Sequence, residues 1–331
     1  MKKFDVYGIG NALLDMVYEV TPEFLNAMGI EKGLMTLVDE DRQTELLGIV
    51  KDLLGVKSCG GSCANTMIAI SQFGGKAFLS CKVADDIEGN YYQKDLLANG
   101  VESNLMDGLK NGVTGKCVVF ITPDADRTMN TFLGITEQFS VEELREDEIK
   151  NSKYVYIEGY LVTSKTGKEA AIKTRKIAQK NNVSVALTLS DPGIVTHFKK
   201  EFLEIMNGKI DLLFCNEEEA KTFTGKSDVK KAFCELKKYS NAFAITLGPN
   251  GAIIFDGKNT FEVKGRKVDA IDTNGAGDLF AGTFLYAITN EIGFEKAGEL
   301  ACYASSELVT TLGARLVKEN VQKIRKKIIG K

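Results

Sequence analysis

The sequence predicts a doubly wound α/β protein, and three observations support this fold class. Short β-rich runs alternate with segments of helical periodicity along most of the chain, as strands and helices do in such folds. The chain has 331 residues, of which 44% are hydrophobic, so it can bury a large core. It contains only four prolines and has neither a low-complexity linker nor an internal repeat. We therefore expect one main domain with an insertion.

The order of elements in the main domain follows from the positions of these runs. Buried strands are predicted at residues 4–10, 76–83, 153–159, 184–190, 211–216 and 242–248. Helices are predicted at residues 62–73, 86–98, 165–181, 197–207, 217–224 and 228–239. A further apolar helical run, LFAGTFLYAI, starts immediately after residue 278.

Two regions, 13–37 and 112–133, break this alternation. Their segments, such as LLDMVYEV and GKCVVFIT, are strand-like, with no helix between them. We assign both regions to a small sheet that stands off the main domain. Such an insertion is placed to act as a lid.

Composition excludes several classes of partner. The net charge of −3 and the pI near 5.6 give no electrostatic case for binding nucleic acid or an anionic membrane. Asp5 and two glycines interrupt any signal-peptide core, and no apolar run approaches the roughly 20 residues that a membrane helix needs. We expect a soluble, cytoplasmic protein whose partners are small molecules, present as a monomer or homodimer.

The cysteines and the single histidine limit the chemistry. Seven scattered cysteines without a CxxC pair favour free thiols in a reducing compartment. A Ser/His/Asp hydrolase or a histidine-rich metal centre would have to be built around His197, which lies in the polar stretch THFKK with no nucleophile motif beside it. We therefore expect any general base to be a carboxylate.

The stretch DTNGAGD, residues 272–278, carries the strongest functional signal. A glycine-rich turn that opens a helix directs free backbone N–H groups and the positive end of the helix dipole at one point, which suits a phosphate. Asp278 adds a carboxylate beside that phosphate, and a carboxylate would repel it. Its chemistry fits a different role, that of accepting a proton from a hydroxyl that attacks the phosphate. The alternative is an aspartate that only caps the helix.

Two motifs in the right order resemble a known family. DTNGAGDLFAGTFL is similar to the second signature of the PfkB, or ribokinase-like, sugar and nucleoside kinases, and GGSCANTMIAISQFGG, residues 60–75, is similar to the first. The GNALLD opening, an NxxE motif at 216–219, TLGPNG at 246–251 and GAR at 313–315 extend the resemblance over nearly the whole chain. It implies a single domain over residues 1–331, a Rossmann-like three-layer α/β/α sandwich with a small β-sheet lid, and ATP-dependent phosphorylation of a primary hydroxyl.

The resemblance also implies catalytic roles. Asp278 would be the base that deprotonates the primary hydroxyl of the substrate. The N–H groups of Gly275, Ala276 and Gly277 would hold the charge that develops on the transferring phosphoryl group. Arg127, in DADRTM on the lid, resembles an arginine that swings onto the γ-phosphate.

Roles toward ATP and its cations follow in the same way. Asn216 and Glu219 would act through water on Mg²⁺ and the phosphates, although an acidic run such as NEEE is also typical of a solvated helix face. The positions implied along ATP are Thr246, Gly248, Gly251 and Asn274, and a TLGPNG turn could equally be only a hairpin connection. Asp272 and Thr273 fall where many members of the family bind a monovalent cation such as K⁺.

The candidate acceptor site combines polar groups and glycines. Its residues are Asn11, Asp15, Gly60, Gly61 and Asn65. A carboxylate can accept hydrogen bonds from two vicinal hydroxyls, and glycines let a sugar approach the backbone, so this set suits a polyol. Leu37, Cys117 and Leu161 are candidates to cover a base or ring, with core packing as the alternative for each.

Four details resemble the adenosine-kinase branch of the family: Asn274 within DTNGAGD, the serine of GGS, the TLSDPG segment at 188–193, and GNALLD. Leu161 stands where animal members carry a base-stacking phenylalanine. The resemblance thus implies transfer of the γ-phosphoryl group to the 5′-hydroxyl of a nucleoside, with adenosine as the first candidate, giving AMP and ADP. The alternatives are a sugar kinase of the ribokinase or fructokinase type and a non-catalytic nucleotide-binding protein on the same fold.

Overall fold

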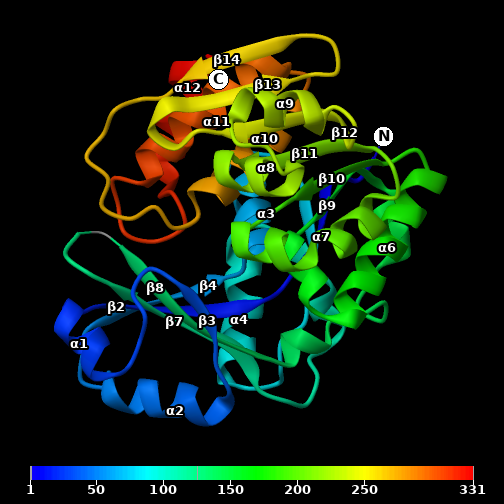
Figure 1. Cartoon of the computed structure of the whole chain (residues 1–331). Helices are drawn as coiled ribbons and strands as arrows, with labels where there is room; N and C mark the ends of the chain where they lie inside the picture. The colour runs from blue at the N-terminus through cyan, green and yellow to red at the C-terminus, as the bar shows by residue number, and fades with distance from the viewer. Residues whose placement is uncertain (1, 125, 331) are drawn as a thin grey trace.

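A computed structural model describes residues 2–124 and 126–330, and the predicted α/β class is confirmed (Figure 1). Its larger sheet has the strand order β14-β13-β12-β11-β10-β9-β1-β5-β6 within the described residues. These strands are β1 (Phe4–Ile9), β5 (Ala77–Ser80), β6 (Glu102–Ser103), β9 (Ser152–Ile157), β10 (Ser184–Thr188), β11 (Ile210–Asn216), β12 (Ser240–Thr246), β13 (Gly251–Phe255) and β14 (Thr260–Lys264). The strands from β12 to β6 pair in parallel, while β13 and β14 pair antiparallel at one edge.

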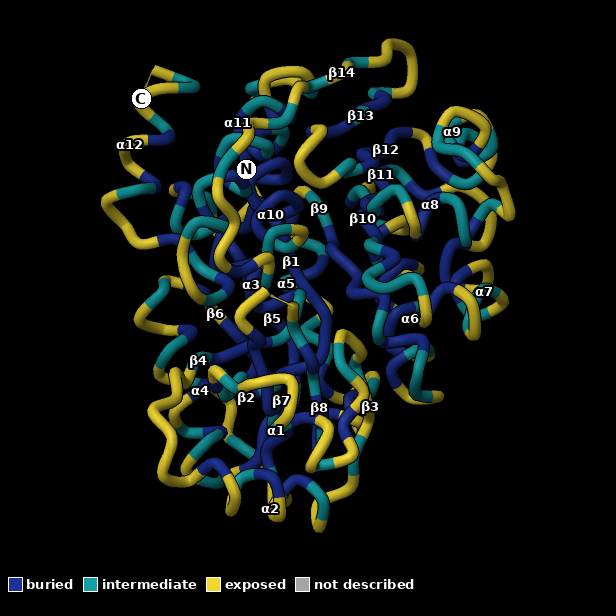
Figure 2. The backbone as a smooth tube through the Cα atoms, turned by 60° about the vertical axis from the view of Figure 1, so that its left-hand side comes forward, coloured by how far each residue is buried: buried dark blue, intermediate teal, exposed yellow. Residues whose placement is uncertain are grey.

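Helices cover both faces of this sheet, which gives three layers. One face carries α3 (Ser62–Gln72), α4 (Ile87–Ala98), α10 (Ala276–Thr289), α11 (Phe294–Leu308) and α12 (Lys318–Ile329). The other carries α5 (Glu146–Lys150), α6 (Lys165–Lys180), α7 (Pro192–Met206), α8 (Glu217–Thr224) and α9 (Val229–Leu236). Successive side chains of β11 point to opposite faces of the sheet, so both faces are apolar and need helices to cover them. Leu212 and Phe214 belong to the core on the first face, and Leu213 belongs to the core on the second. Figure 2 shows the central strands buried between the helical layers.

The helix that follows DTNGAGD is held firmly at the centre of the fold. Phe280 and Phe284 of α10 meet the ring of Phe214 edge-on, with centroids 6.5 and 5.7 Å apart. A Cβ at Gly282 would lie 2.5 Å from the carbonyl oxygen of Thr66, so the backbones of α10 and α3 approach closely. This contact brings the N-terminal ends of the two helices, which carry the two sequence signatures, side by side.

A second, smaller sheet lies beside the carboxyl ends of the parallel strands, at the lower left of Figure 1. Its order is β3 (Met35–Leu37), β8 (Arg127–Gly134), β7 (Thr114–Ile121), β2 (Leu13–Glu19) and β4 (Gly55–Gly60). Regions 13–37 and 112–133 supply four of these five strands; Ala125, inside the second region, lies outside the described residues.

The expectation that region 13–37 holds no helix was wrong. Helix α1 (Pro22–Ala27) lies within it because Thr21 caps its N-terminus, accepting a hydrogen bond from the backbone N–H of Phe24, and Pro22 fits the first turn. Helix α2 (Glu40–Ile49) and strand β4 were not predicted either. The two helices cover one face of the small sheet, where Leu25 and Leu46 pack against Phe120.

Other boundaries shifted for local reasons. The helix expected at 197–207 is preceded by a further helical segment that starts at Pro192, with a kink between them at Phe198, because Asp191 accepts hydrogen bonds from the backbone N–H groups of Gly193 and Ile194 and caps that segment. The TLGPNG segment is indeed a hairpin connection between β12 and β13.

All seven cysteines are free thiols. In the described part of the chain, no helix has both the length and the apolar character needed to cross a bilayer.

Candidate functional site

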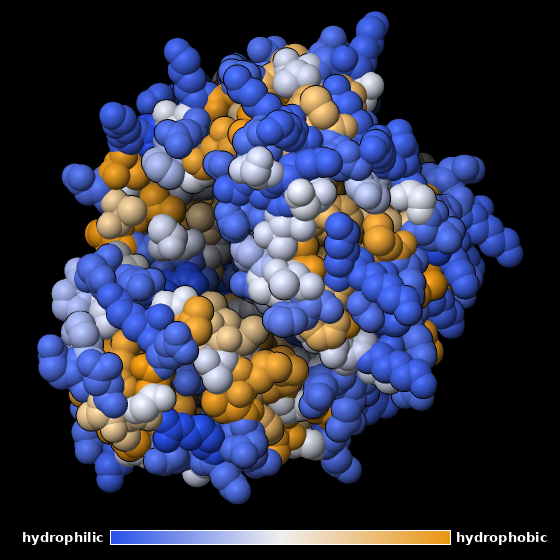
Figure 3. Space-filling model, viewed as in Figure 1, coloured by the Kyte–Doolittle hydropathy of each residue, from blue (hydrophilic) through white to orange (hydrophobic). Residues whose placement is uncertain are grey.

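A cavity of about 510 Å³ lies between the main sheet and the small sheet. Its main-sheet wall is built from the carboxyl ends of parallel strands, the usual place for ligands in open α/β sheets: Glu158 follows β9, Thr188 ends β10, and Asn216 ends β11. The small sheet contributes Asp15 from β2 and Arg127 from β8. Figure 3 shows the surface hollowed between the two parts of the molecule.

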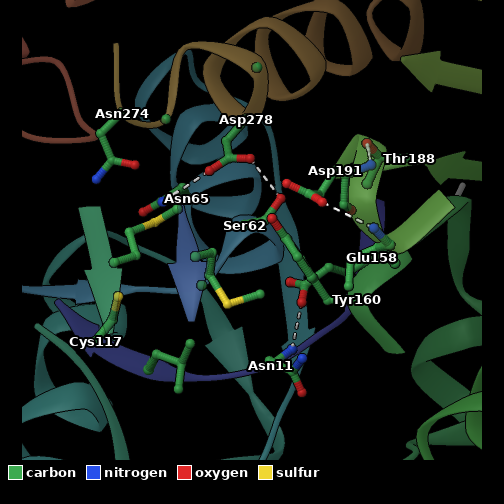
Figure 4. Close-up of a pocket in the computed structure, with 18 of the residues that line it drawn as sticks. Asn11, Ser62, Asn65, Cys117, Glu158, Tyr160, Thr188, Asp191, Asn274 and Asp278 are labelled. Atoms are coloured by element: carbon green, nitrogen blue, oxygen red, sulfur yellow. Dashed lines mark hydrogen bonds between the residues drawn. The ribbon is translucent and has the colours of Figure 1, made fainter. Parts of the chain in front are cut away.

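Asp278 lies in the first turn of α10 and faces this cavity (Figure 4). One of its carboxylate oxygens accepts a hydrogen bond from Ser62 Oγ at 2.6 Å, and the other accepts one from Asn65 Nδ2 at 3.0 Å. Both donors come from the first turns of α3. Asp278 makes no capping bond within α10, so helix capping does not explain it.

The turn before Asp278 presents backbone N–H groups to the cavity. Gly275 is the N-cap of α10 with φ of 69°, and a Cβ there would lie 2.6 Å from the Cβ of Ala314. Glycine is required on both counts. No side chain caps α10, and within the described residues the backbone N–H of Gly277 has no partner, whereas that of Ala276 donates to the carbonyl oxygen of Thr273 at 3.3 Å. Ala276 and Gly277 both line the cavity, so this helix N-terminus can meet a ligand there.

Burial raises the pKa values of the two aspartates in the cavity. Desolvation raises the pKa of Asp278 above its ordinary value, opposed by the hydrogen bonds from Ser62 and Asn65 and by the charge of Arg127. Desolvation also raises the pKa of Asp15 to about 7, although Arg315 and Arg127 act in the opposite direction.

The candidate acceptor residues gather on one side of this cavity. Asn11, Asp15, Gly61 and Asn65 line it. Gly60 does not, but a Cβ at Gly60 would overlap the carboxylate of Asp15, so the glycine leaves room for that side chain. The glycine pair is therefore explained by the space that a neighbouring carboxylate and a close backbone approach require.

Leu161 requires a correction. It was a candidate to cover the acceptor, with core packing as the alternative, and core packing is what the structure shows: it is 1% exposed and packs beneath α6 and α7. The residue before it, Tyr160, lines the cavity instead, because successive side chains of the short 3₁₀ helix after β9 point in directions about 120° apart. The other two candidates, Leu37 and Cys117, do line the cavity.

The NxxE motif forms a capping box at the start of α8. Asn216 Oδ1 accepts from the backbone N–H of Glu219 at 2.8 Å, and the carboxylate of Glu219 accepts from the backbone N–H of Asn216 at 3.0 Å. Glu219 is only 5% exposed, so the solvated-face alternative fails for it, while Glu218 is exposed to solvent. Burial raises the pKa of Glu219 to about 7. Both motif residues line the cavity.

Asp272 holds the glycine turn in place through hydrogen bonds to the backbone. Its carboxylate accepts hydrogen bonds from the backbone N–H groups of Asn274 at 2.8 Å and Gly313 at 2.9 Å. Arg127 Nε lies 3.7 Å from the same carboxylate, which brings the small sheet against the turn. Asp272 does not line the cavity, whereas Thr273 and Asn274 do.

A second cavity, of about 770 Å³, adjoins the first. Thr246, Gly248 and Gly251 line it, and Thr246 also lines the first cavity. The two cavities share Ala276 and Gly277, so they meet at the N-terminus of α10. Two ligands could therefore approach the same N–H groups from opposite sides.

Besides Tyr160, sequence reasoning assigned no site role to Ser62 and Glu158. Ser62, the serine of GGS, was noted only as a detail that resembles the adenosine-kinase branch and was given no role in the site. Glu158 is 1% exposed, and its carboxylate accepts hydrogen bonds from the backbone N–H groups of Asn11 at 3.2 Å and Cys63 at 2.8 Å. Burial raises its pKa to about 8. The available signal was an isolated acidic residue at the carboxyl end of a buried strand.

Known proteins share this architecture. Residues 48–320 match the model of the pfkB family of carbohydrate kinases. Adenosine kinase 1 of Arabidopsis thaliana is 26% identical, covering 92% of this chain and 94% of its own length. The solved adenosine kinase of Sinorhizobium meliloti is 32% identical with a TM-score of 0.91, covering 98% of this chain and 99% of its own. A probable sugar kinase from Rhizobium etli CFN 42 matches with the same identity and TM-score, covering 99% of each chain.

Proposed function

The chain belongs to the pfkB family of carbohydrate kinases, phosphotransferases that use ATP and an alcohol acceptor, and we propose that its acceptor is the 5′-hydroxyl of a nucleoside, with adenosine as the first candidate. The observation that carries this proposal is the position of Asp278. Its carboxylate faces the first cavity near the point where that cavity meets the second, beside the N-terminal turn of α10.

In the proposed reaction, the acceptor occupies the first cavity and ATP occupies the second. Asp278 takes the proton of the acceptor's 5′-hydroxyl while the hydroxyl oxygen attacks the γ-phosphorus of ATP. The bond between the γ-phosphorus and the oxygen that bridges it to the β-phosphate then breaks, which releases ADP. Ser62 and Asn65 hold the carboxylate in place. The N–H groups of Ala276 and Gly277 stabilise the negative charge on the transferring group, and Arg127 adds a positive charge from the small sheet.

Mg²⁺ fits the residues present. Glu219 is a buried carboxylate that lines the first cavity, and among the described residues its hydrogen-bond donors belong to Asn216 alone. Oxygen ligands of this kind suit Mg²⁺ bound through water, so we assign Glu219 and Asn216 to that role. When bound, Mg²⁺ neutralises phosphate charge.

A K⁺ ion held by Asp272 and Thr273 is a separate proposal. It is tested by comparing kcat in K⁺ with kcat in Li⁺ at constant ionic strength.

The character of the acceptor cavity favours a nucleoside. Its Asn11 and Asp15 suit the hydroxyls of a ribose, while Leu37, Cys117 and Tyr160 offer apolar surface that a free sugar would leave in contact with water. The adenosine kinases among the similar proteins support the same choice. A furanose kinase is the second candidate, because a probable sugar kinase matches this structure equally well. The presence of Asp278, the glycine turn and NxxE together argues against a non-catalytic role.

ADP release with Mg²⁺ and ATP should distinguish these candidates. The test set is adenosine, guanosine, inosine, ribose and fructose, each assayed over a range of concentrations. We expect the highest kcat/KM for adenosine. A thermal-shift series with the same compounds separates binding from turnover, since a ligand at 100 times its Kd stabilises by about 2.7 kcal/mol. Preferential turnover of ribose or fructose would replace the nucleoside assignment, and binding without ADP release would support the non-catalytic alternative.

We further propose that the small sheet acts as a lid. If it closes over the acceptor, residues 13–37 and 112–133 should gain protection from hydrogen exchange when the acceptor binds, while 246–251 changes less. Mass spectrometry of deuterium uptake with and without adenosine measures this, and ADP alone is the control that should protect 246–251 instead. Equal protection of all three segments, or none, would indicate a fixed sheet.

A further inference from the structure

Arg315 connects three elements around the site without lining either cavity. Its Nη1 donates to Asp95 Oδ2 of α4 at 2.5 Å, its Nη2 donates to the carbonyl oxygen of Cys59 in β4, and its Nε donates to Asn65 Oδ1 of α3 at 3.3 Å. The side chain is 16% exposed. Because the two outer nitrogens are fixed by Asp95 and Cys59, the remaining N–H is held toward Asn65.

The amide of Asn65 is therefore placed between a pure donor and a pure acceptor. A guanidinium can only donate hydrogen bonds, so the Asn65 atom that faces Arg315 must be the oxygen. The NH₂ group must then face the ionised carboxylate of Asp278, to which it donates at 3.0 Å. The opposite orientation of the amide would place its oxygen against the carboxylate and its NH₂ against the guanidinium, and both contacts would be repulsive.

We propose that Arg315 is a positioning residue: it fixes the orientation of the Asn65 amide and, through that amide, the orientation of the Asp278 carboxylate. The inference rests on the proposed role of Asp278 as the base. Without Arg315 only the contact with Asp278 orients the amide, so Asn65 is held less firmly and its hydrogen bond to Asp278 is formed for less of the time, while the bond from Ser62 remains. A carboxylate that is held on one side alone spends less time aligned with the attacking hydroxyl, which lowers the rate of the chemical step.

Two variants of Arg315 and a double-mutant cycle test this proposal. Arg315→Met removes all three donors, and Arg315→Lys keeps a positive charge near Asp95 but loses the planar fork. We expect kcat to fall about 10- to 100-fold in Arg315→Met, the range for a lost hydrogen bond to a charged group, with the KM for ATP unchanged. Arg315→Lys should recover only part of this loss. The matched control is Arg145→Met, which removes a guanidinium paired with Asp107 at a distance from both cavities and should leave kcat unchanged.

The cycle with Asn65→Ala decides whether Arg315 acts through the amide. If it does, Arg315→Met should change kcat less than about 2-fold once Asn65 is alanine, because the group that it orients is gone. Arg315 also lowers the pKa of Asp15, so a rise in the acceptor KM should persist in that background while the effect on kcat disappears. Equal fold-losses of kcat in both backgrounds would overturn the proposal and leave Arg315 a purely structural residue.

Three further outcomes are distinguished. If Arg315→Met fails to fold, as judged by circular dichroism, the same cycle is run with Arg315→Lys, which retains the ion pair. If Asp278→Asn turns over normally, the proposed function itself fails. If Asp278→Asn is slow while both Arg315 variants match the wild type, the proposed function stands and the positioning role alone is rejected.

Discussion

Replacement of Asp278 by asparagine should lower kcat by roughly 10² to 10⁴-fold, the range for loss of a general base. Asparagine keeps the size of the side chain and can still contact Ser62 and Asn65, but it cannot accept the proton of the attacking hydroxyl. Because Asp278 is assigned to the acceptor side of the junction between the cavities, the Kd for ATP should change little. Steady-state ADP release and calorimetric titration of ATP measure the two quantities.

Asp228→Asn is a suitable control for this variant. Asp228 caps α9 in an exposed position far from both cavities, and asparagine is an equally good capping residue. If a carboxylate at a helix terminus were all that mattered, the two substitutions would be equally mild. Near-normal turnover in Asp278→Asn would therefore remove the base from the proposed mechanism.

The pH dependence of kcat gives a second test of the same residue. Asp278 must be ionised to accept a proton, and burial raises its pKa above the ordinary value of 3.8. The active form is therefore lost as pH falls through the raised pKa. We expect kcat to be constant at higher pH and to fall on the acid side with a midpoint above 3.8, and the residual activity of Asp278→Asn to lack this limb.

The fold was predicted mainly from the way apolar strand-like runs alternate along the chain with segments of helical periodicity. The central strands of the main sheet are buried on both faces, so they contain continuous apolar runs, such as LLFC in β11, and are easily recognised. Helix α1 was missed because its six residues are too few to display a helical period, and its signal lies in Thr21 and Pro22 rather than in hydrophobic spacing. Short capped helices of this kind require attention to turn chemistry.

Site residues could be predicted where a sequence motif reflects a constraint on the backbone. They were harder to predict where the direction of a side chain determines whether the residue faces the cavity. The glycine turn before Asp278 and the capping box of Glu219 both leave a local sequence signature. In contrast, Leu161 and Tyr160 are adjacent in a short helical turn, and composition alone does not tell which one faces the cavity. Glu158 was missed for a related reason, since its partners are backbone N–H groups that are distant in sequence, from the loop after β1 and from the first turn of α3.

Asp15→Ala should affect binding of the acceptor more than the chemical step. The residue lines the acceptor cavity, and the proposal gives it the ring hydroxyls rather than the reacting one, so its contacts exist before the transition state as well as in it. We expect the acceptor KM to rise about 10- to 200-fold, which corresponds to a charged hydrogen bond worth roughly 1.5 to 3 kcal/mol. A smaller fall in kcat should accompany it, because looser positioning also slows the reaction.

The KM of the wild type should also depend on pH near neutrality. Burial raises the pKa of Asp15 to about 7, and hydroxyls donate more strongly to the ionised carboxylate. Binding should therefore weaken as pH falls below about 7, and the acceptor KM should rise. In Asp15→Ala this dependence should disappear, whereas the acid limb of kcat, which belongs to Asp278, should remain.

A cycle that combines Asp15→Ala with a deoxynucleoside identifies the contact. If adenosine is the acceptor, 2′-deoxyadenosine should be a poor substrate for the wild type, because Asp15 then loses its partner and remains a desolvated carboxylate. In Asp15→Ala the deoxynucleoside should lose most of its disadvantage, since the missing hydroxyl and the missing carboxylate belong to one interaction. The ratio of kcat/KM for adenosine to that for 2′-deoxyadenosine, measured in both proteins, gives the coupling. Equal ratios in the two proteins would show that Asp15 does not contact the 2′-hydroxyl, and the nucleoside assignment would then depend on the apolar wall of the cavity alone.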